Sequence, residues 1–119
     1  MRHDAGSLDE LPPGSKRRVV AGRLTVVVCR AEDGSVYALH DRCPHQGAPL
    51  SDGTLEGTTL PSDPGSYVYG RRREILRCPW HAYEFDVKTG CALFADRSMR
   101  VRTYRVGIED GRIVVDDAR

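Results

Sequence analysis

The sequence lacks the features that mark several large classes of protein. It has no run of about 18 apolar residues, which a membrane-spanning helix would need. Neither sign of charge dominates, because 18 basic residues face 17 acidic ones and the net charge is +1. This balance argues against a nucleic-acid surface or a polybasic membrane anchor. The first ten residues, MRHDAGSLDE, are polar and do not resemble a secretory signal, so we expect a cytoplasmic protein.

Long helical patterns are also missing. No stretch of ten residues has convincing helical periodicity, and the 12 glycines and 7 prolines disfavour a helical bundle. Short Val-rich segments are separated by turns instead, and Asp33-Gly34 and Asp110-Gly111 are strong hairpin signals. The segments expected to be strands are 16–21, 24–30, 36–40, 73–77, 83–86, 101–109 and 112–116. The length of 119 residues fits one domain, and the pattern predicts an all-β, antiparallel sandwich or barrel.

Two parts of the chain stand apart from this pattern. Residues 1–10 are expected to form a flexible N-terminal tail, which leaves residues 11–116 as the domain. Residues 58–73 hold two prolines, two glycines and three consecutive arginines. We interpret this segment as an inserted hairpin with a solvated basic tip. The alternative is a docking or dimer surface, since tyrosine and arginine are favoured in interfaces.

The four cysteines fall into two pairs with different surroundings. Without an export signal, a disulfide framework is disfavoured, and Cys43 and Cys78 lie next to histidines, where a metal site is the better interpretation. Cys29 lies inside a Val-rich run, and Cys91 opens an apolar stretch. We interpret both as small buried hydrophobic residues, with a disulfide between them as the alternative.

Two short motifs carry the chemistry. Cys43 and His45 are spaced Cys-x-His, Cys78 and His81 are spaced Cys-x-x-His, and 32 residues separate the two motifs. Each motif follows an expected strand, so two loops from adjacent hairpins could converge on one inorganic centre. Three interpretations are open: ordinary core residues, a structural zinc site of two Cys and two His, or a 2Fe-2S cluster with two ligands of each kind.

The surrounding residues favour the iron-sulfur cluster. The chain resembles the Rieske ferredoxin family over roughly residues 11–116, because CPHQGAPLSDG and CPWHAYEFDVKTG match that family's two cluster-binding loops. The resemblance implies a Rieske-type β-sandwich or barrel with a small cluster-binding subdomain, whose loops are about 41–50 and 78–83. It also implies that Cys43 and Cys78 bind one iron of a Rieske 2Fe-2S cluster and that His45 and His81 bind the other.

The function that the resemblance implies is one-electron transfer. We expect the protein to pass electrons from a reductase to a terminal oxygenase or similar oxidoreductase. It is not expected to be a stand-alone enzyme, because only His3 and His40 remain to build a second iron site. One alternative is a small electron-input subunit of a larger oxidoreductase, as in the nitrite reductase family. The other is a zinc-stabilised binding module without a redox role.

Departures from the family pattern bear on the reduction potential. High-potential members carry a cysteine in each loop that together form a disulfide, and the matching positions here are Ala48 and Trp80. Those members also place hydroxyl groups against the sulfurs, at positions that match Tyr83 and Phe85. Because hydrogen bonds to sulfur stabilise the more negative reduced cluster, their loss lowers the potential. We therefore expect the low-potential, oxygenase-ferredoxin branch. Ala82 also replaces the glycine that usually follows the second histidine.

The docking surface is expected at the edge of the domain that bears His45 and His81. Arg97, Arg100 and the arginines of 71–73 are the positively charged candidates for contact with a partner. We expect these side chains to add electrostatic steering of the redox partner proteins.

Overall fold

The computed structural model describes residues 2–44, 47–60, 68–79, 83–93 and 99–116, and these form short antiparallel strands. Two single-turn 3-10 helices, Leu8–Glu10 and Leu50–Asp52, lie between strands. The all-β expectation is confirmed. In chain order the strands are β1 (Arg2–Ser7), β2 (Lys16–Ala21), β3 (Leu24–Arg30), β4 (Val36–His40), β5 (Thr54–Leu60), β6 (Val68–Arg77), β7 (Glu84–Asp86), β8 (Thr103–Glu109) and β9 (Arg112–Asp116).

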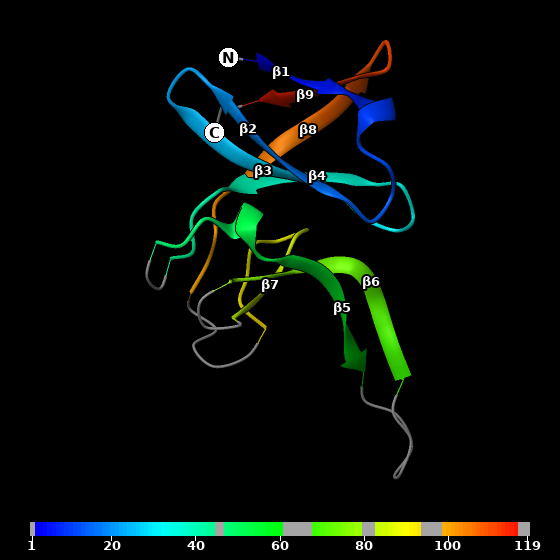
Figure 1. Cartoon of the computed structure of the whole chain (residues 1–119), viewed down its shortest axis with the longest axis vertical. Helices are drawn as coiled ribbons and strands as arrows, with labels where there is room; N and C mark the ends of the chain where they lie inside the picture. Colours follow the sequence, from blue (N-terminus) through cyan, green and yellow to red (C-terminus); the bar gives the residue numbers. More distant parts are fainter. Residues whose placement is uncertain (1, 45–46, 61–67, 80–82, 94–98, 117–119) are drawn as a thin grey trace.

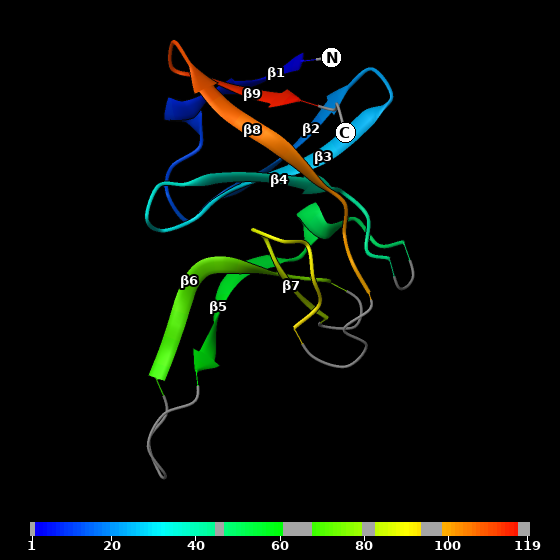
Figure 2. The same cartoon turned by 180° about the vertical axis from the view of Figure 1, so that it is seen from behind.

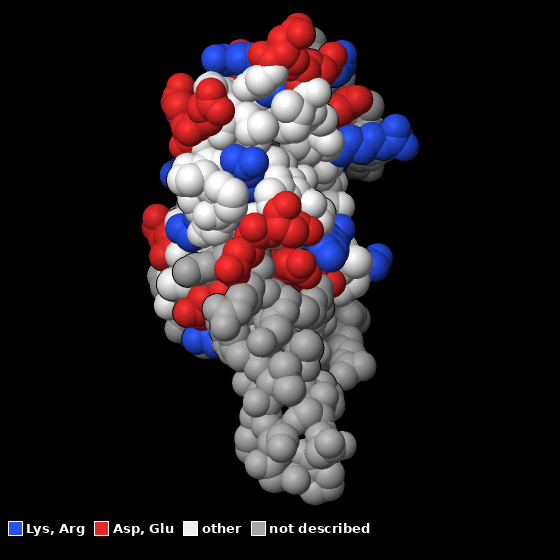
Figure 3. Space-filling view, turned by 90° about the vertical axis from the view of Figure 1, so that its right-hand side faces the viewer, with Lys and Arg blue, Asp and Glu red and all other residues white. Residues whose placement is uncertain are grey.

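The strands form two sheets that lie one above the other in Figure 1. The larger sheet has the order β1-β9-β8-β4-β3-β2 and curls until β1 comes close to β2, which makes a nearly closed barrel (Figure 1 and Figure 2). The smaller sheet, β5-β6-β7, lies beside one end of the barrel. On the face shown in Figure 3, acidic and basic side chains are interspersed over the described residues.

The two Asp-Gly pairs both join hairpins, but they do so differently. Asp110 and Gly111 have φ values of 50° and 74°, so both central residues of the β8–β9 turn are left-handed, as a primed two-residue turn requires. Asp33-Gly34 instead lies in a five-residue loop that the Ala31 N–H closes on the Ser35 carbonyl at 2.8 Å. Only Gly34 has a positive φ in that loop.

The amino-terminal segment differs from the sequence-based expectation of a flexible tail. Residues 2–7 form β1, which pairs antiparallel with β9, and Ala5 is buried. Arg112 also forms an ion pair with Asp4 at 2.8 Å. Because β1 lies at the edge of the sheet, one partner strand is enough to order it despite its polar sequence.

Strand β3 is buried on both faces, which explains its uninterrupted apolar sequence. Successive side chains of a strand point to opposite faces, so Val26 and Val28 enter one core while Val27 and Cys29 enter another. The first core fills the barrel, with Ala5, Leu11, Ala38, Ile113 and Val115. The second core joins the barrel to the small sheet and contains Cys43, Cys78, Leu39, Leu55, Leu76 and Phe85 among others. We call this second group the shared core.

Strands β5 and β6 pair as the two arms of a hairpin that includes the described residues of 58–73 and extends beyond them on both sides. Strand β6 begins at Val68, five residues before the expected start, and pairs with β5 from Leu60↔Val68 to Thr54↔Arg77. It pairs with β7 only over Ile75–Arg77. The remainder is a two-stranded arm that extends away from the barrel (Figure 1), and its tip, 61–67, lies outside the described residues.

A stability prediction follows from the tight junction between the small sheet and the barrel. Gly90 has a φ of +77°, its carbonyl accepts from the Val101 N–H at 2.8 Å, and a Cβ here would overlap the Val101 carbonyl oxygen. Gly111 has nearly the same φ but open space around it. Gly111→Ala should therefore lower the free energy of unfolding by about 1 kcal/mol and Gly90→Ala by at least about 2 kcal/mol more. Urea unfolding measures both, and equal losses would contradict the geometry.

Candidate metal centre

The two cysteines of the motifs are brought into the same buried region. Cys43 comes three residues after β4 and Cys78 directly follows β6, and the two residues are 0% and 2% exposed in the shared core. Both thiols therefore belong to one apolar core, as two converging loops would require. His45 and His81 lie outside the described residues.

Each cysteine also closes its own loop through the backbone. The Cys43 N–H donates to the Ala48 carbonyl at 2.7 Å, and the Cys78 N–H donates to the Tyr83 carbonyl at 2.8 Å. Gly47, with a φ of +79°, donates its N–H back to the Cys43 carbonyl at 2.8 Å, a turn that favours glycine. Each loop is thus closed at its base by a backbone hydrogen bond of its cysteine.

A buried carboxylate fastens the first loop at its base. The Asp41 side chain is fully buried and accepts hydrogen bonds from the Ser51 N–H at 2.7 Å and the Ser51 hydroxyl at 2.6 Å. Arg18 Nε lies 3.4 Å from the same carboxylate, and Lys16 donates to the Ser51 carbonyl. A buried charge is stable only with such partners. Sequence reasoning missed this pair, because nothing in the sequence links Asp41 with a serine ten residues later.

The end of the first loop is joined to the start of the second. Gly53 packs so closely on β6 that a Cβ would overlap the Arg77 carbonyl oxygen, and Thr54 pairs with Arg77 directly before Cys78. The glycine is required for this close approach and not for its φ, which is −81°. Each loop is therefore positioned by the other as well as by the barrel.

The two residues at the hydroxyl positions, Tyr83 and Phe85, lie against or within the shared core. Phe85 is fully buried in the shared core with both cysteines, and Tyr83 packs against that core. Met99 packs there too. Because phenylalanine has no hydroxyl group, Phe85 cannot donate a hydrogen bond to a sulfur atom.

The other two cysteines differ from each other. Cys29 is a free thiol whose burial raises its pKa to about 12, which confirms its interpretation as a small core residue. Cys91 was expected to be buried as well, and this expectation is wrong. It is partly exposed at an isolated bridge with Arg100, whose Nε and Nη2 lie 3.3 and 3.1 Å from its sulfur. Hydrogen bonds with Thr89 and Arg100 lower the pKa of this free thiol.

The described residues alone do not complete a metal site. Within them, no group of three or more His, Cys, Asp or Glu side chains comes together. His3 lies in β1 and His40 at the end of β4, and neither contributes to such a group. Two buried thiols in one apolar region nevertheless fit a centre that binds thiolate ligands and excludes water. No helix among the described residues is long and apolar enough to cross a membrane.

Comparison with known proteins identifies the centre. The sequence matches the Rieske [2Fe-2S] domain family over residues 2–105. The ferredoxin component of the naphthalene 1,2-dioxygenase system of Pseudomonas aeruginosa is 36% identical over 113 residues, which cover 95% of this chain and 92% of that protein. A chain from the complex of reduced oxygenase and oxidised ferredoxin in carbazole 1,9a-dioxygenase has a TM-score of 0.76 and 26% identity, with 96% of this chain and 91% of that chain covered.

A second solved structure shares the fold of this chain. The small subunit of an NADH-dependent nitrite reductase from Mycobacterium tuberculosis has a TM-score of 0.77, covering 100% of this chain and 96% of that one. At 24% identity this likeness concerns the fold alone. The family match covers most of the chain and agrees with the two thiols in the shared core. The protein therefore belongs to the Rieske [2Fe-2S] domain family and carries that family's 2Fe-2S cluster.

Proposed function

We propose that Cys43 and Cys78 bind one iron of the cluster and that His45 and His81 bind the other. The observation that carries this assignment is the burial of both thiols in one apolar core, each at the start of a loop closed by its own backbone hydrogen bond. Pro44 and Pro79 directly follow the two cysteines and are exposed. Each chain segment thus passes from the core to the surface within one residue of its cysteine.

We further propose that the protein is a one-electron carrier between a reductase and a terminal oxygenase. The bound cluster supplies one-electron redox chemistry in a potential range of about −150 to +300 mV for the Rieske type. Asp41, Ser51 and Gly53 hold the loops rigid, and the shared core keeps water from the thiolate side. The Pseudomonas aeruginosa relative is named as a ferredoxin component of a dioxygenase system, and this supports an oxygenase as acceptor.

Two alternatives remain from the sequence, and the comparisons bear on each of them differently. A nitrite-reductase-like subunit shares the fold, but the likeness of 24% identity carries no functional argument. A zinc-stabilised module does not agree with the family match. A cytoplasmic location is part of the proposal, because thiolate ligands and two free thiols suit a reducing compartment.

The electron-transfer proposal is tested with the purified holo-protein. Mixed with a ferredoxin reductase and a terminal oxygenase of the naphthalene dioxygenase type, it should be reduced by the reductase and reoxidised by the oxygenase. Product formation should depend on its concentration. Reoxidation by a nitrite reductase catalytic subunit, and not by any oxygenase, would favour the alternative subunit. A protein that undergoes no reduction would contradict both.

The ligand assignment predicts different outcomes for two buried cysteines. Cys78→Ala should abolish cluster assembly and lower the free energy of unfolding, because binding of the metal contributes to folding. Cys29→Ala removes a thiol that is equally buried but has no place in the assignment. It should keep iron, sulfide and the visible spectrum. Iron and acid-labile sulfide analysis measures both variants, and unchanged iron content in Cys78→Ala would remove Cys78 from the ligand set.

The residues at the hydroxyl positions predict the reduction potential. With Phe85 in place of a hydroxyl donor, the midpoint should lie near the bottom of the Rieske range, at about −150 to −50 mV. Phe85→Tyr should raise it by some tens of millivolts, since a new hydrogen bond to sulfur stabilises the reduced state and 59 mV corresponds to about 1.4 kcal/mol for one electron. Voltammetry of both proteins measures the shift. A wild-type midpoint above about +100 mV at neutral pH would contradict the assignment to the low-potential branch.

A further inference from the structure

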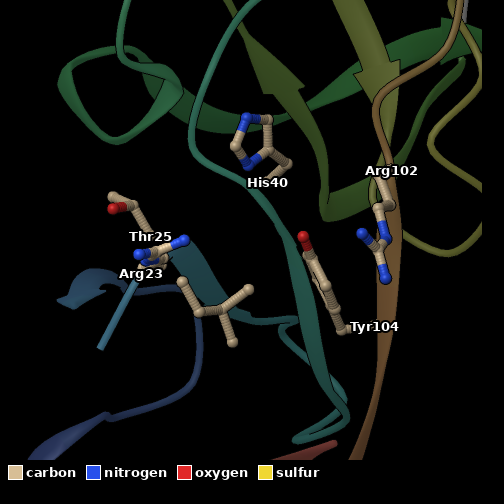
Figure 4. A pocket seen from close by; sticks show the side chains of 6 residues that line it. Arg23, Thr25, His40, Arg102 and Tyr104 are labelled. Carbon is tan, nitrogen blue, oxygen red and sulfur yellow. The ribbon is translucent and has the colours of Figure 1, made fainter. Parts of the chain in front are cut away.

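A hollow of about 340 Å³ opens on the barrel at the point where β4 leads into the first cluster-binding loop (Figure 4). Arg23 and Thr25 lie on one side of it, Arg102 and Tyr104 lie on the other, and His40 lies at one end. We call this hollow the basic groove. Its described lining consists of Arg23, Leu24, Thr25, His40, Arg102 and Tyr104.

The groove is built on a fixed backbone. The His40 N–H donates to the Arg102 carbonyl at 2.8 Å, and the Asp41 N–H donates to the Thr25 carbonyl at 3.1 Å. Its lining therefore comes from three chain segments, around the starts of β3 and β8 and the end of β4, that are joined to each other by hydrogen bonds. A site on such paired strands is preorganised and needs little ordering on binding.

The charges around the groove have one sign. Arg23 and Arg102 are the charged side chains among its lining residues, Arg102 lies behind the Tyr104 ring in Figure 4, and none of the lining residues that the structure describes is acidic. The neighbouring carboxylate, Asp41, is turned away and is held by Ser51 and Arg18. Arg102 lies over the Tyr104 ring, with its Cζ 4.6 Å from the ring centroid, which helps to fix its orientation.

The groove lies close to the cluster-binding loops. His40 precedes Cys43 by three residues, so their Cα atoms lie within about 11 Å of each other. In both Figure 1 and Figure 2, the chain that enters the first loop and the chain that enters β8 run along the same side of the molecule. A protein partner of ordinary size covers about 800 Å², a patch some 30 Å across. A partner that docks over the first loop therefore covers the groove as well.

We propose that the basic groove receives an aspartate or glutamate side chain of a redox partner protein, next to the edge through which electrons pass. This inference rests on the proposed electron-transfer function. Guanidinium groups bind carboxylates through paired hydrogen bonds, and the exposed Arg23 offers such donors at the groove, while Arg102 adds positive charge on the other side. An open groove at the docking edge suits a carboxylate that a protein carries into it, because the remaining interface then supplies the affinity that a free anion lacks.

The test compares charge reversals of equal size inside and outside the groove. Arg23→Glu changes an exposed residue of the β2–β3 turn, and Arg105→Glu changes an exposed residue of β8 that does not line the groove. The pre-reduced protein is mixed with the terminal oxygenase, and the oxidised protein is mixed with the reductase. Both reactions are followed at about 20 mM and about 200 mM salt. Arg23→Glu should slow at least one reaction about tenfold at low salt, and Arg105→Glu less than about twofold.

The remaining measurements separate the possible outcomes. The difference between the electron-transfer rates of the two variants should become smaller at high salt. The visible spectrum and the midpoint potential of both variants should match those of the wild type. Equal rates for Arg23→Glu and Arg105→Glu with both partners would overturn the proposal. Tight binding of sodium acetate or inorganic phosphate by the wild type, measured by calorimetry and lost in Arg23→Glu, would also overturn it in favour of a small-anion site. Failure of the wild type to exchange electrons with either protein would instead overturn the proposed function.

Discussion

The structure depends on the burial of two thiols in one apolar core that two sheets share. Cys43 and Cys78 arrive there from different hairpins, and the barrel contributes the same core through one face of β3 and β4. Because β3 is buried on both faces, the barrel interior and the shared core are packed against a common strand. Under the proposed ligand assignment, binding of the cluster and folding of the small sheet are coupled, since both thiols are core residues.

Around this core, polar contacts and close backbone packing position the described parts of the loops. Asp41 and Ser51 close the base of the first loop, and Gly53 lets its end pack against the strand that leads into Cys78. Pro44 and Pro79 are exposed one residue after each buried cysteine. Thiols in the core and exposed prolines directly after them suit a one-electron carrier: the core limits solvent access, and the exposed residues lie where a partner can approach.

Much of this arrangement could be predicted from the sequence, because local patterns determine it. Val-rich runs and Asp-Gly pairs predict β2, β3, β4, β8 and β9, and the Cys-x-His and Cys-x-x-His spacings predict two converging loops. What could not be predicted depends on contacts between distant residues. The polar segment Arg2–Ser7 becomes a strand only because β9, about a hundred residues later, pairs with it.

Contacts between distant residues also explain where the site differs from the expectations drawn from the sequence. Cys91 was assigned to the core from its apolar neighbours, yet Arg100 meets it at the surface and lowers the pKa of its thiol. The pairing of Asp41 with Ser51 and the groove between Arg23 and Arg102 likewise follow from tertiary structure.

The most direct test of the central claim is metal and sulfide analysis of the aerobically purified wild-type protein, together with its visible spectrum. The account predicts a red-brown protein with iron and acid-labile sulfide in a one-to-one ratio and without stoichiometric zinc. A colourless protein that binds one zinc per chain, contains no sulfide and does not take up a cluster on reconstitution with iron and sulfide would contradict it.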